Sequence, residues 1–407
     1  MQKVAQKAAI TALALALGTS AALAQKKYGP GVTDTEIKIG NIMPYSGPAS
    51  AFSMIGRTMA AYFDKVNAEG GINGRKIKFI SYDDSYSPPK TVEMARKLVE
   101  RDDVLLIFGS LGTPTNAAIR KYMNAKKVPQ LFVASGATKW GDPKHYPWTM
   151  GWLPPYQSEA RIYAKYLLAN YPNAKIGILY QNDDLGKDYI TGLKDGLGGK
   201  AAKMIVSEQP YELTDPTADS QIVNLKASGA DVFFDAATPK FAAQAIKKVA
   251  EIGWHPVHLL SDVSQSVGAV LKPAGLKNSK GILSVHIMKD ATNPRWKDDA
   301  GYKGWAAFMD EYFPHGDKNS VFTVAGYTLA QTLVQVLNQC GDNLTRENVM
   351  KQAANLRNLE LPMLLPGIKI NTSPSDYYPI EQLQMQRFNG TRWEPIGPIM
   401  NGDISGS

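Results

Sequence analysis

The stretch that decides the fold is residues 105–119, LLIFGSLGTPTNAAI, where an apolar run leads directly into a helix start. The run 105–108 is typical of a buried strand. Two glycines follow in the turn 109–112, and Thr113 with Pro114 predicts an N-cap and a first helical residue. A helix that begins at the carboxyl end of a strand has free backbone N–H groups, which favour an anion. An ordinary capped helix of an α/β domain would have the same sequence.

Strands and helices alternate along most of the chain. The first series consists of strands at 37–43, 76–82, 105–108 and 130–133 with helices between them, and it ends in a Pro- and aromatic-rich stretch, 146–156. We interpret that stretch as a crossing between domains. A second series of the same kind fills 158–286. Repeated βα units predict parallel sheets that are covered on both faces, so we expect an α/β protein with two similar lobes.

The C-terminal part has a different pattern. Helices are predicted at 296–313, 322–339 and 345–355, and the Asn389-Gly390 pair indicates a hairpin turn. Such a tail fits two lobes only if the chain crosses between them more than once. Several connections between two domains form a hinge.

Length and composition support two globular domains. Residues 25–407 exceed the size of about 250 to 300 residues at which single cores stop growing. The chain is 44% hydrophobic and 20% charged, and its one cysteine, Cys340, excludes an internal disulfide. The formal net charge is +8, but the lysines are scattered, which argues against nucleic-acid binding.

The N-terminus predicts export. Lys3 and Lys7 precede the apolar run 8–17, and Ala22-Leu23-Ala24 forms a small-x-small cleavage site before Gln25. This is the pattern of a cleavable secretory signal peptide over residues 1–24. No later stretch has about 18 uninterrupted apolar residues, so we expect an exported chain that does not span the membrane.

The sequence carries no recognisable catalytic motif. It has no GxGxxG after a strand, no GxxxxGK[ST] and no GxSxG, and its five histidines are dispersed. We therefore expect no enzyme activity, no metal and no cofactor. An exported enzyme is the weakest of the alternatives.

Three stretches together resemble a known family. They are residues 37–48 (IKIGNIMPYSGP), 66–75 (VNAEGGINGR) and 82–84 (YDD), in that order and spacing. They closely resemble the leucine/isoleucine/valine-binding proteins, the periplasmic substrate receptors of branched-chain amino-acid-type ABC transporters. The resemblance implies two Rossmann-like lobes with parallel central sheets, joined by a three-strand hinge. We expect lobe 1 to hold residues 25–150 and 288–362, and lobe 2 residues 151–287 and 363–407.

The resemblance also implies where a ligand binds in the first lobe. Thr113 would give its hydroxyl and backbone N–H to a ligand carboxylate, and the turn Gly136-Ala137-Thr138 would add backbone groups and a second hydroxyl. Both turns follow parallel strands, at the edge where open α/β sheets bind ligands. The first-lobe positions implied to touch ligand are Phe52, Leu111, Thr113, Ser135, Gly136 and Thr138.

The second lobe departs from the amino-acid pattern. Its implied ligand positions are Leu185, Asp219, Thr238 and Lys240, with Trp152 and Tyr156 of the crossing as apolar walls. Lys240 stands where the family has an acidic partner for the ligand ammonium. A buried ammonium without a charged partner costs several kcal/mol. We therefore expect a hydrophobic or aromatic acid without a free α-amino group.

Two alternatives stay open at this point. If Lys240 points to solvent, Asp219 or Asp184 would pair with an ammonium, and a branched-chain amino acid becomes the expected ligand. The same fold also serves ligand sensors that present themselves to a signalling receptor. The favoured function is transport: a monomer closes on a small carboxylate and delivers it to the permease subunits of an ABC transporter.

Overall fold

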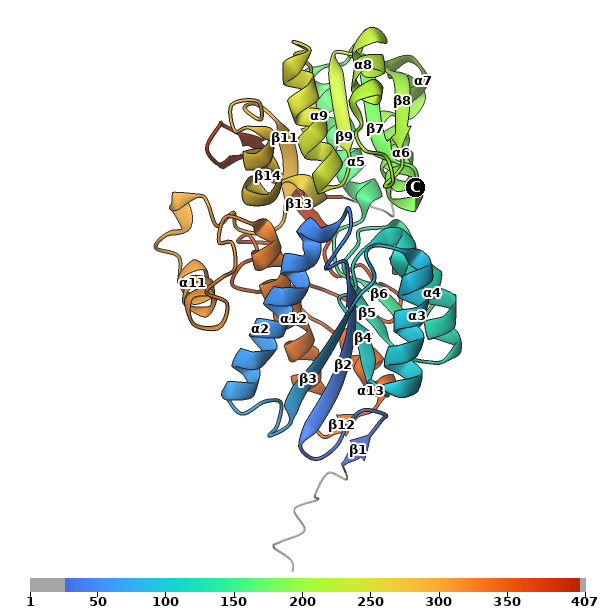
Figure 1. Cartoon of the computed structure of the whole chain (residues 1–407), viewed down its shortest axis with the longest axis vertical. Helices are drawn as coiled ribbons and strands as arrows, with labels where there is room; N and C mark the ends of the chain where they lie inside the picture. The colour runs from blue at the N-terminus through green and yellow to red at the C-terminus, as the bar shows by residue number, and fades with distance from the viewer. Residues whose placement is uncertain (1–25, 403–407) are drawn as a thin grey trace, which may run out of the picture.

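Two lobes stack along the long axis of the molecule in the computed structural model, which describes residues 26–402 (Figure 1). The first lobe is built on a parallel five-stranded sheet with the spatial order β3-β2-β4-β5-β6. In that order the strands are Lys76–Asp83, Glu36–Met43, Leu106–Phe108, Gln130–Val133 and Thr149–Gly151. The predicted signal peptide lies outside the described residues.

Helices cover both faces of this sheet because alternate strand residues point to opposite sides. Ile42 and Ile107 pack beneath α3 and α4, whereas Ile39 and Phe108 belong to the core under α2. The helices are α2 (Ser53–Ala68), α3 (Pro88–Arg96) and α4 (Thr113–Ala125), with short helical turns at Ser50–Phe52, Lys97–Arg101 and Thr138–Gly141.

The second lobe has a seven-stranded sheet with the order β14-β13-β11-β10-β9-β7-β8. Its last two strands form the hairpin expected at Asn389-Gly390 and run antiparallel, so this sheet is mixed rather than wholly parallel. The strands are β7 (Ile176–Gln181), β8 (Ile205–Tyr211), β9 (Val232–Ala236), β10 (Val257–Leu260), β11 (Leu283–His286), β13 (Gln382–Phe388) and β14 (Trp393–Asn401).

The helices of the second lobe connect its parallel strands. They are α5 (Tyr156–Asn170), α6 (Asp184–Leu197), α7 (Ala201–Met204), α8 (Asp219–Ala227), α9 (Pro239–Glu251) and α10 (Lys272–Ala274), with short turns at Gly198–Lys200, Asp262–Ser264 and Val267–Leu271. Among the described residues, no helix in either lobe has the length and apolar character needed to cross a bilayer.

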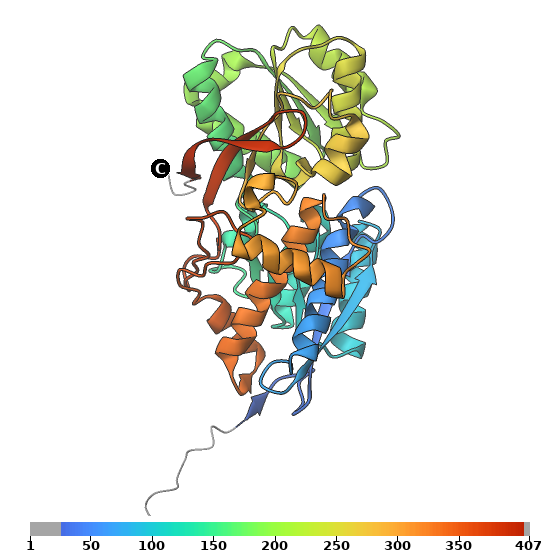
Figure 2. The ribbon, with the colours of Figure 1, turned by 90° about the vertical axis from the view of Figure 1, so that its left-hand side faces the viewer.

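The chain passes between the two sheets at 152–155, 287–299 and 354–381 within the described residues. The first of these is shorter than the expected crossing, because Thr149–Gly151 pairs with β5 and completes the first sheet. Between the second and third crossings the chain returns to the first lobe (Figure 2). There α11 (Ala300–Tyr312) and α12 (Val321–Cys340) pack on α2. The second crossing contains a short turn at Pro294–Trp296. After α12 come β12 (Asn343–Leu344), which pairs with β1 (Lys27–Tyr28), and α13 (Arg346–Ala353).

Candidate ligand site between the lobes

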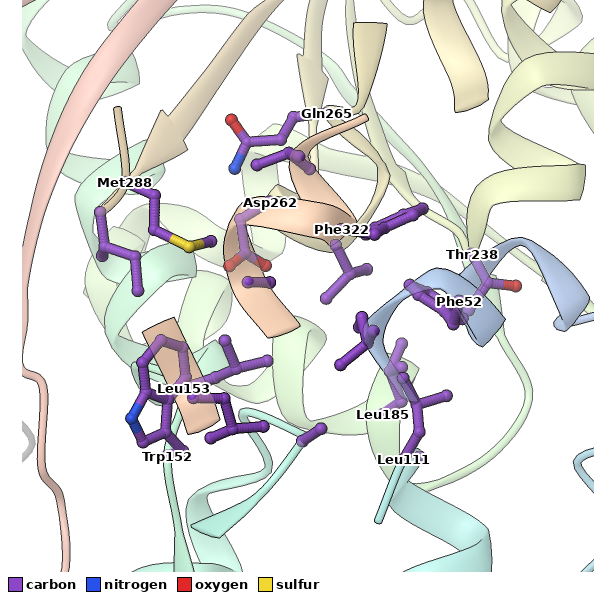
Figure 3. A pocket seen from close by; sticks show the side chains of 18 of the residues that line it. Phe52, Leu111, Trp152, Leu153, Leu185, Thr238, Asp262, Gln265, Met288 and Phe322 are labelled. Atoms are coloured by element: carbon purple, nitrogen blue, oxygen red, sulfur yellow. The ribbon is translucent and has the colours of Figure 1, made fainter. Parts of the chain in front are cut away.

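A cavity lies between the lobes and receives side chains from both (Figure 3). Its volume is about 70 Å³, several times what one water molecule needs. Most of the wall is apolar, which is typical of small-molecule sites. The apolar lining residues are Phe52, Ile55, Leu111, Ala134, Trp152, Leu153, Leu185, Val263, Ile287, Met288, Val321, Phe322, Ala325 and Leu329.

Six of the residues expected at the ligand line this cavity: Phe52, Leu111, Trp152, Tyr156, Leu185 and Thr238. The Phe52 ring packs against the Phe322 ring at a centroid distance of 5.0 Å, which joins the start of α2 to α12. The indole N–H of Trp152 donates to the Thr332 hydroxyl at 3.0 Å, which fixes the orientation of the ring. These contacts hold the apolar wall in one arrangement.

The turn before α4 differs from the sequence expectation. The N-cap is Gly112 and not Thr113. The φ of Gly112 is 103°, a left-handed value that favours glycine at this position. Thr113 is the first helical residue, is fully buried, and shares a 2.7 Å hydrogen bond with the Ser135 hydroxyl. Its hydroxyl therefore does not cap the helix.

Tyr156 occupies the position where a ligand carboxylate was expected. Burial raises the pKa of its phenol, which lies beside the Thr113 and Ser135 hydroxyls and the backbone of Gly136. Its own backbone N–H also donates to the Gly136 carbonyl at 2.7 Å. A Cβ at Gly136 would lie 2.6 Å from the Tyr156 ring, so this ring needs the glycine. In this conformation Thr113, Ser135 and Gly136 are satisfied by the protein and do not line the cavity.

Thr138 links the two lobes instead of facing the cavity. Its backbone N–H and its hydroxyl donate to the Asp188 carboxylate of α6, at 2.7 and 2.9 Å. Next to it, Lys139 forms an ion pair with Asp184. Buried Tyr86 of the first lobe lies beside Gln181 of the second. The structure is thus a closed arrangement of the two lobes.

Lys240 and Asp219 lie away from the cavity, which corrects the expectation for the second lobe. On the first turn of α9, Phe241 is buried while Lys240 is exposed and donates to the Asp215 carbonyl at 3.4 Å. Asp219 pairs with Lys248 at 3.6 Å on the outer side of α8 and α9. Because Lys240 is outside, it does not repel a positive group in the cavity.

Asp262 is a cavity residue that the sequence reading missed. It follows β10 at the carboxyl end of the sheet, so its position after a strand was the available signal. Figure 3 shows its carboxylate between Met288 and Phe322, directed into the cavity. Gln265, three residues later, also lines the cavity. The remaining polar wall consists of Tyr86, Tyr156 and Thr238, and the Thr238 hydroxyl donates to Gln181 at 3.2 Å.

Comparison with known proteins agrees with this architecture. The Leu/Ile/Val-binding protein homolog 2 of Brucella abortus (strain 2308) is 24% identical over 320 residues, which cover 77% of this chain and 81% of that protein. A branched-chain amino acid ABC transporter protein from Thermus thermophilus, solved with bound valine, has a TM-score of 0.82 at 16% identity, covering 91% and 97% of the two chains. A fatty acid ABC transporter substrate-binding protein from Thermomonospora curvata has a TM-score of 0.75 at 21% identity, covering 92% and 95%.

The sequence model of the family described as periplasmic binding protein matches residues 36–392, nearly all of the described chain. The chain therefore belongs to the periplasmic binding proteins, a family that binds substrates and does not catalyse reactions.

Proposed function

We propose that this chain is the substrate-binding protein of an ABC transporter and that it captures a small hydrophobic solute bearing a carboxylate. The observation that carries the proposal is the cavity between two hinged lobes, with apolar side chains from both lobes in its wall. A solute that touches both lobes stabilises the closed state over the open one, because its affinity for the two states differs. The closed monomer would then dock on the permease subunits at the inner membrane.

The apolar wall favours a hydrocarbon body for the solute. Phe52, Leu111, Trp152 and Leu185 come from four separate segments, and in Figure 3 Trp152 lies on the side opposite the other three. Burying apolar surface contributes roughly 25 cal/mol per Å², so a branched or aromatic side chain alone supplies about 2 to 3 kcal/mol. The Thermus and Thermomonospora proteins, whose names give valine and fatty acids, have the same fold with hydrophobic ligands.

The carboxylate of the solute would hydrogen-bond to residues other than those expected from the sequence. The Thr113 and Ser135 hydroxyls bond to each other, and Thr138 bonds to Asp188. Tyr86, Tyr156, Thr238 and Gln265 are cavity residues with side chains able to donate to a carboxylate. The exclusion of an amino group rested on Lys240, which is outside, so apolar amino acids are candidates beside apolar acids.

The test is a ligand screen by thermal shift and calorimetry on the mature protein, after unfolding and refolding to release any bound solute. We expect hydrophobic carboxylates, with or without an amino group, to raise the melting temperature, and glutamate, arginine and glucose to leave it unchanged. A Phe52→Asp variant should lose that shift, whereas Val223→Asp, at an exposed position, should keep it. A response to polar solutes alone would overturn the proposal.

A further inference from the structure

A second hollow lies at the outer end of the second lobe. It is a groove of about 500 Å³, at the edge of the sheet where β10 and β11 begin and β13 ends. The cavity between the lobes lies at the opposite edge, where Leu185, Thr238 and Asp262 follow the carboxyl ends of β7, β9 and β10. None of the described residues lines both hollows, so the groove is a separate feature of the molecule.

The charged side chains in the wall of this groove are all basic. Within residues 26–402 no aspartate or glutamate lines it, whereas four basic residues do: His255, His258, Lys280 and Arg387. Neighbouring strands bring these residues together. The two histidines stand at the start of β10, Lys280 precedes β11, and Arg387 of β13 pairs with the first residue of β11. The four residues are far apart in the sequence, so no basic run in the sequence marks the groove.

The exposed bases of the groove have no acidic partner in the described part of the chain. Lys280 and His255 make no side-chain hydrogen bond or ion pair with any residue of 26–402. Arg387 donates to the Tyr166 hydroxyl at 3.5 Å and has no carboxylate of these residues within ion-pair distance. Cations held together without acidic partners repel one another and attract anions. A bound anion would therefore relieve this repulsion.

His258 adds a buried polar group to the wall. It is 7% exposed, and its Nε2 lies 3.4 Å from Oδ2 of Asp235, which is fully buried. The Nδ1 atom is therefore the ring nitrogen without a partner among the described residues. Asp235 Oδ1 also lacks a hydrogen-bond partner in this part of the chain. A second proton on the His258 ring would balance the Asp235 carboxylate and make Nδ1 a donor to a bound anion.

Aromatic and aliphatic side chains form the rest of the wall. Trp254 is buried, and its indole N–H donates to the Ala230 carbonyl at 3.1 Å, which fixes the ring. Tyr171 is half-buried, and its hydroxyl makes no hydrogen bond to any described residue. Val257 and Ile282 also line the groove. Apolar surface beside uncompensated cations favours an organic anion over a bare inorganic ion.

We propose that this groove is a second binding site, separate from the cavity between the lobes, and that it takes an organic phosphate monoester. Lys280, Arg387 and His258 Nδ1 would donate to the phosphate, and the organic group would lie against Tyr171 and Trp254. A phosphate monoester carries nearly two negative charges at neutral pH and three strong acceptor oxygens, which matches several cationic donors. Lysine and arginine bind phosphate through charge-assisted hydrogen bonds.

The test uses phenyl phosphate, phenol, which lacks the anion, and inorganic phosphate, which lacks the ring, in calorimetry on the mature protein. We expect phenyl phosphate to bind most tightly and its affinity to fall as the salt concentration rises. A second arm measures sedimentation with vesicles of phosphatidylcholine and phosphatidic acid, whose headgroup is a phosphate monoester. Binding in the first arm supports a free ester as the ligand, and binding in the second arm alone supports a lipid headgroup. Absence of binding in both arms overturns the inference.

Variants locate the bound phosphate. The double variant Lys280→Gln/Arg387→Gln should weaken phosphate binding about tenfold or more, because two charge-assisted hydrogen bonds are lost. The matched control is Lys203→Gln/Arg101→Gln, which removes the same charge at exposed positions outside the groove and should keep the native affinity. His258→Gln should also weaken binding. If that variant does not fold, a shift of the His258 ring signals in NMR spectra of the native protein on titration with phenyl phosphate takes its place. Equal affinities of the two double variants, or His258 signals that do not move, overturn the inference.

Discussion

The Tyr156 backbone N–H donates to the Gly136 carbonyl at 2.7 Å, so a residue at the start of α5 is tied to the first-lobe turn, with its phenol beside Thr113 and Ser135. The ring also stacks on Tyr189 of α6 at a centroid distance of 4.6 Å. Tyr156 thus connects the first-lobe turn to α5 and α6 of the second lobe.

Tyr156→Phe tests this structural role. The substitution removes a buried hydroxyl from beside the Thr113 and Ser135 hydroxyls, so we expect a loss of about 1 kcal/mol in the free energy of unfolding. Urea denaturation followed by circular dichroism measures it. Tyr180→Phe is the matched control, because Tyr180 is half-buried on β7 and no hydrogen bond of its hydroxyl is described. Equal stability of the two variants would contradict the role.

Closure of the lobes depends on Asp188. Its carboxylate accepts two hydrogen bonds from Thr138 across the lobes and one from Gln157, at 2.7 Å, within the second lobe. We expect Asp188→Ala to shift the population toward the open state, because the first-lobe donors lose their acceptor. Small-angle scattering of the ligand-free protein should then give a larger radius of gyration.

The control for this shift lies on the same helix. Asp195 of α6 pairs with Arg161 inside the second lobe and makes no described contact with the first. Asp195→Ala should leave the radius of gyration at the native value. A radius that is unchanged in Asp188→Ala, or raised equally in both variants, would show that these hydrogen bonds do not govern closure.

The fold was predictable because its signals are local. Alternating apolar strands and helices, together with the Asn389-Gly390 turn, indicated the two sheets and the hairpin before any contact was known. The edge of the sheet that binds ligand followed from topology, since parallel strands end together. Leu111 and Leu185 follow two such strands, one in each lobe, and both line the cavity.

The site's polar residues were harder to predict because their orientation depends on packing. Lys240 and Phe241 are neighbours, and only the burial of Phe241 against Tyr211, at a centroid distance of 4.2 Å, turns the lysine outward. The Asp262 backbone N–H donates to the Glu159 carboxylate, about 100 residues earlier in the chain on α5. No local pattern in the sequence records such a contact.

His286 should make stability fall in mild acid. Burial lowers the pKa of this histidine from 6.5 to about 4, and its Nε2 has no described partner. As the pH drops from about 6.5 to about 4, the unfolded chain takes up a proton that the folded chain does not, so stability is lost in that window. Across this pH range the free energy of unfolding falls by about 3 kcal/mol. His286→Gln should remove this part of the pH dependence in urea titrations, whereas exposed His315→Gln should retain it.

The Glu159–Asp262 pair should give the opposite slope. Burial raises the pKa of both carboxyl groups, so the folded protein keeps a proton at pH values where the unfolded chain has lost it. Stability contributed by that proton is present in acid and decreases as the pH rises above the ordinary carboxyl range. In Glu159→Gln the amide donates through its N–H groups at every pH. The variant should therefore lose less stability than the native protein between about pH 5 and about pH 8. Urea titrations at several pH values measure the difference, with Glu251→Gln, an exposed residue of α9, as control. Parallel curves for Glu159→Gln and the native protein would mean that the pair holds no extra proton when folded.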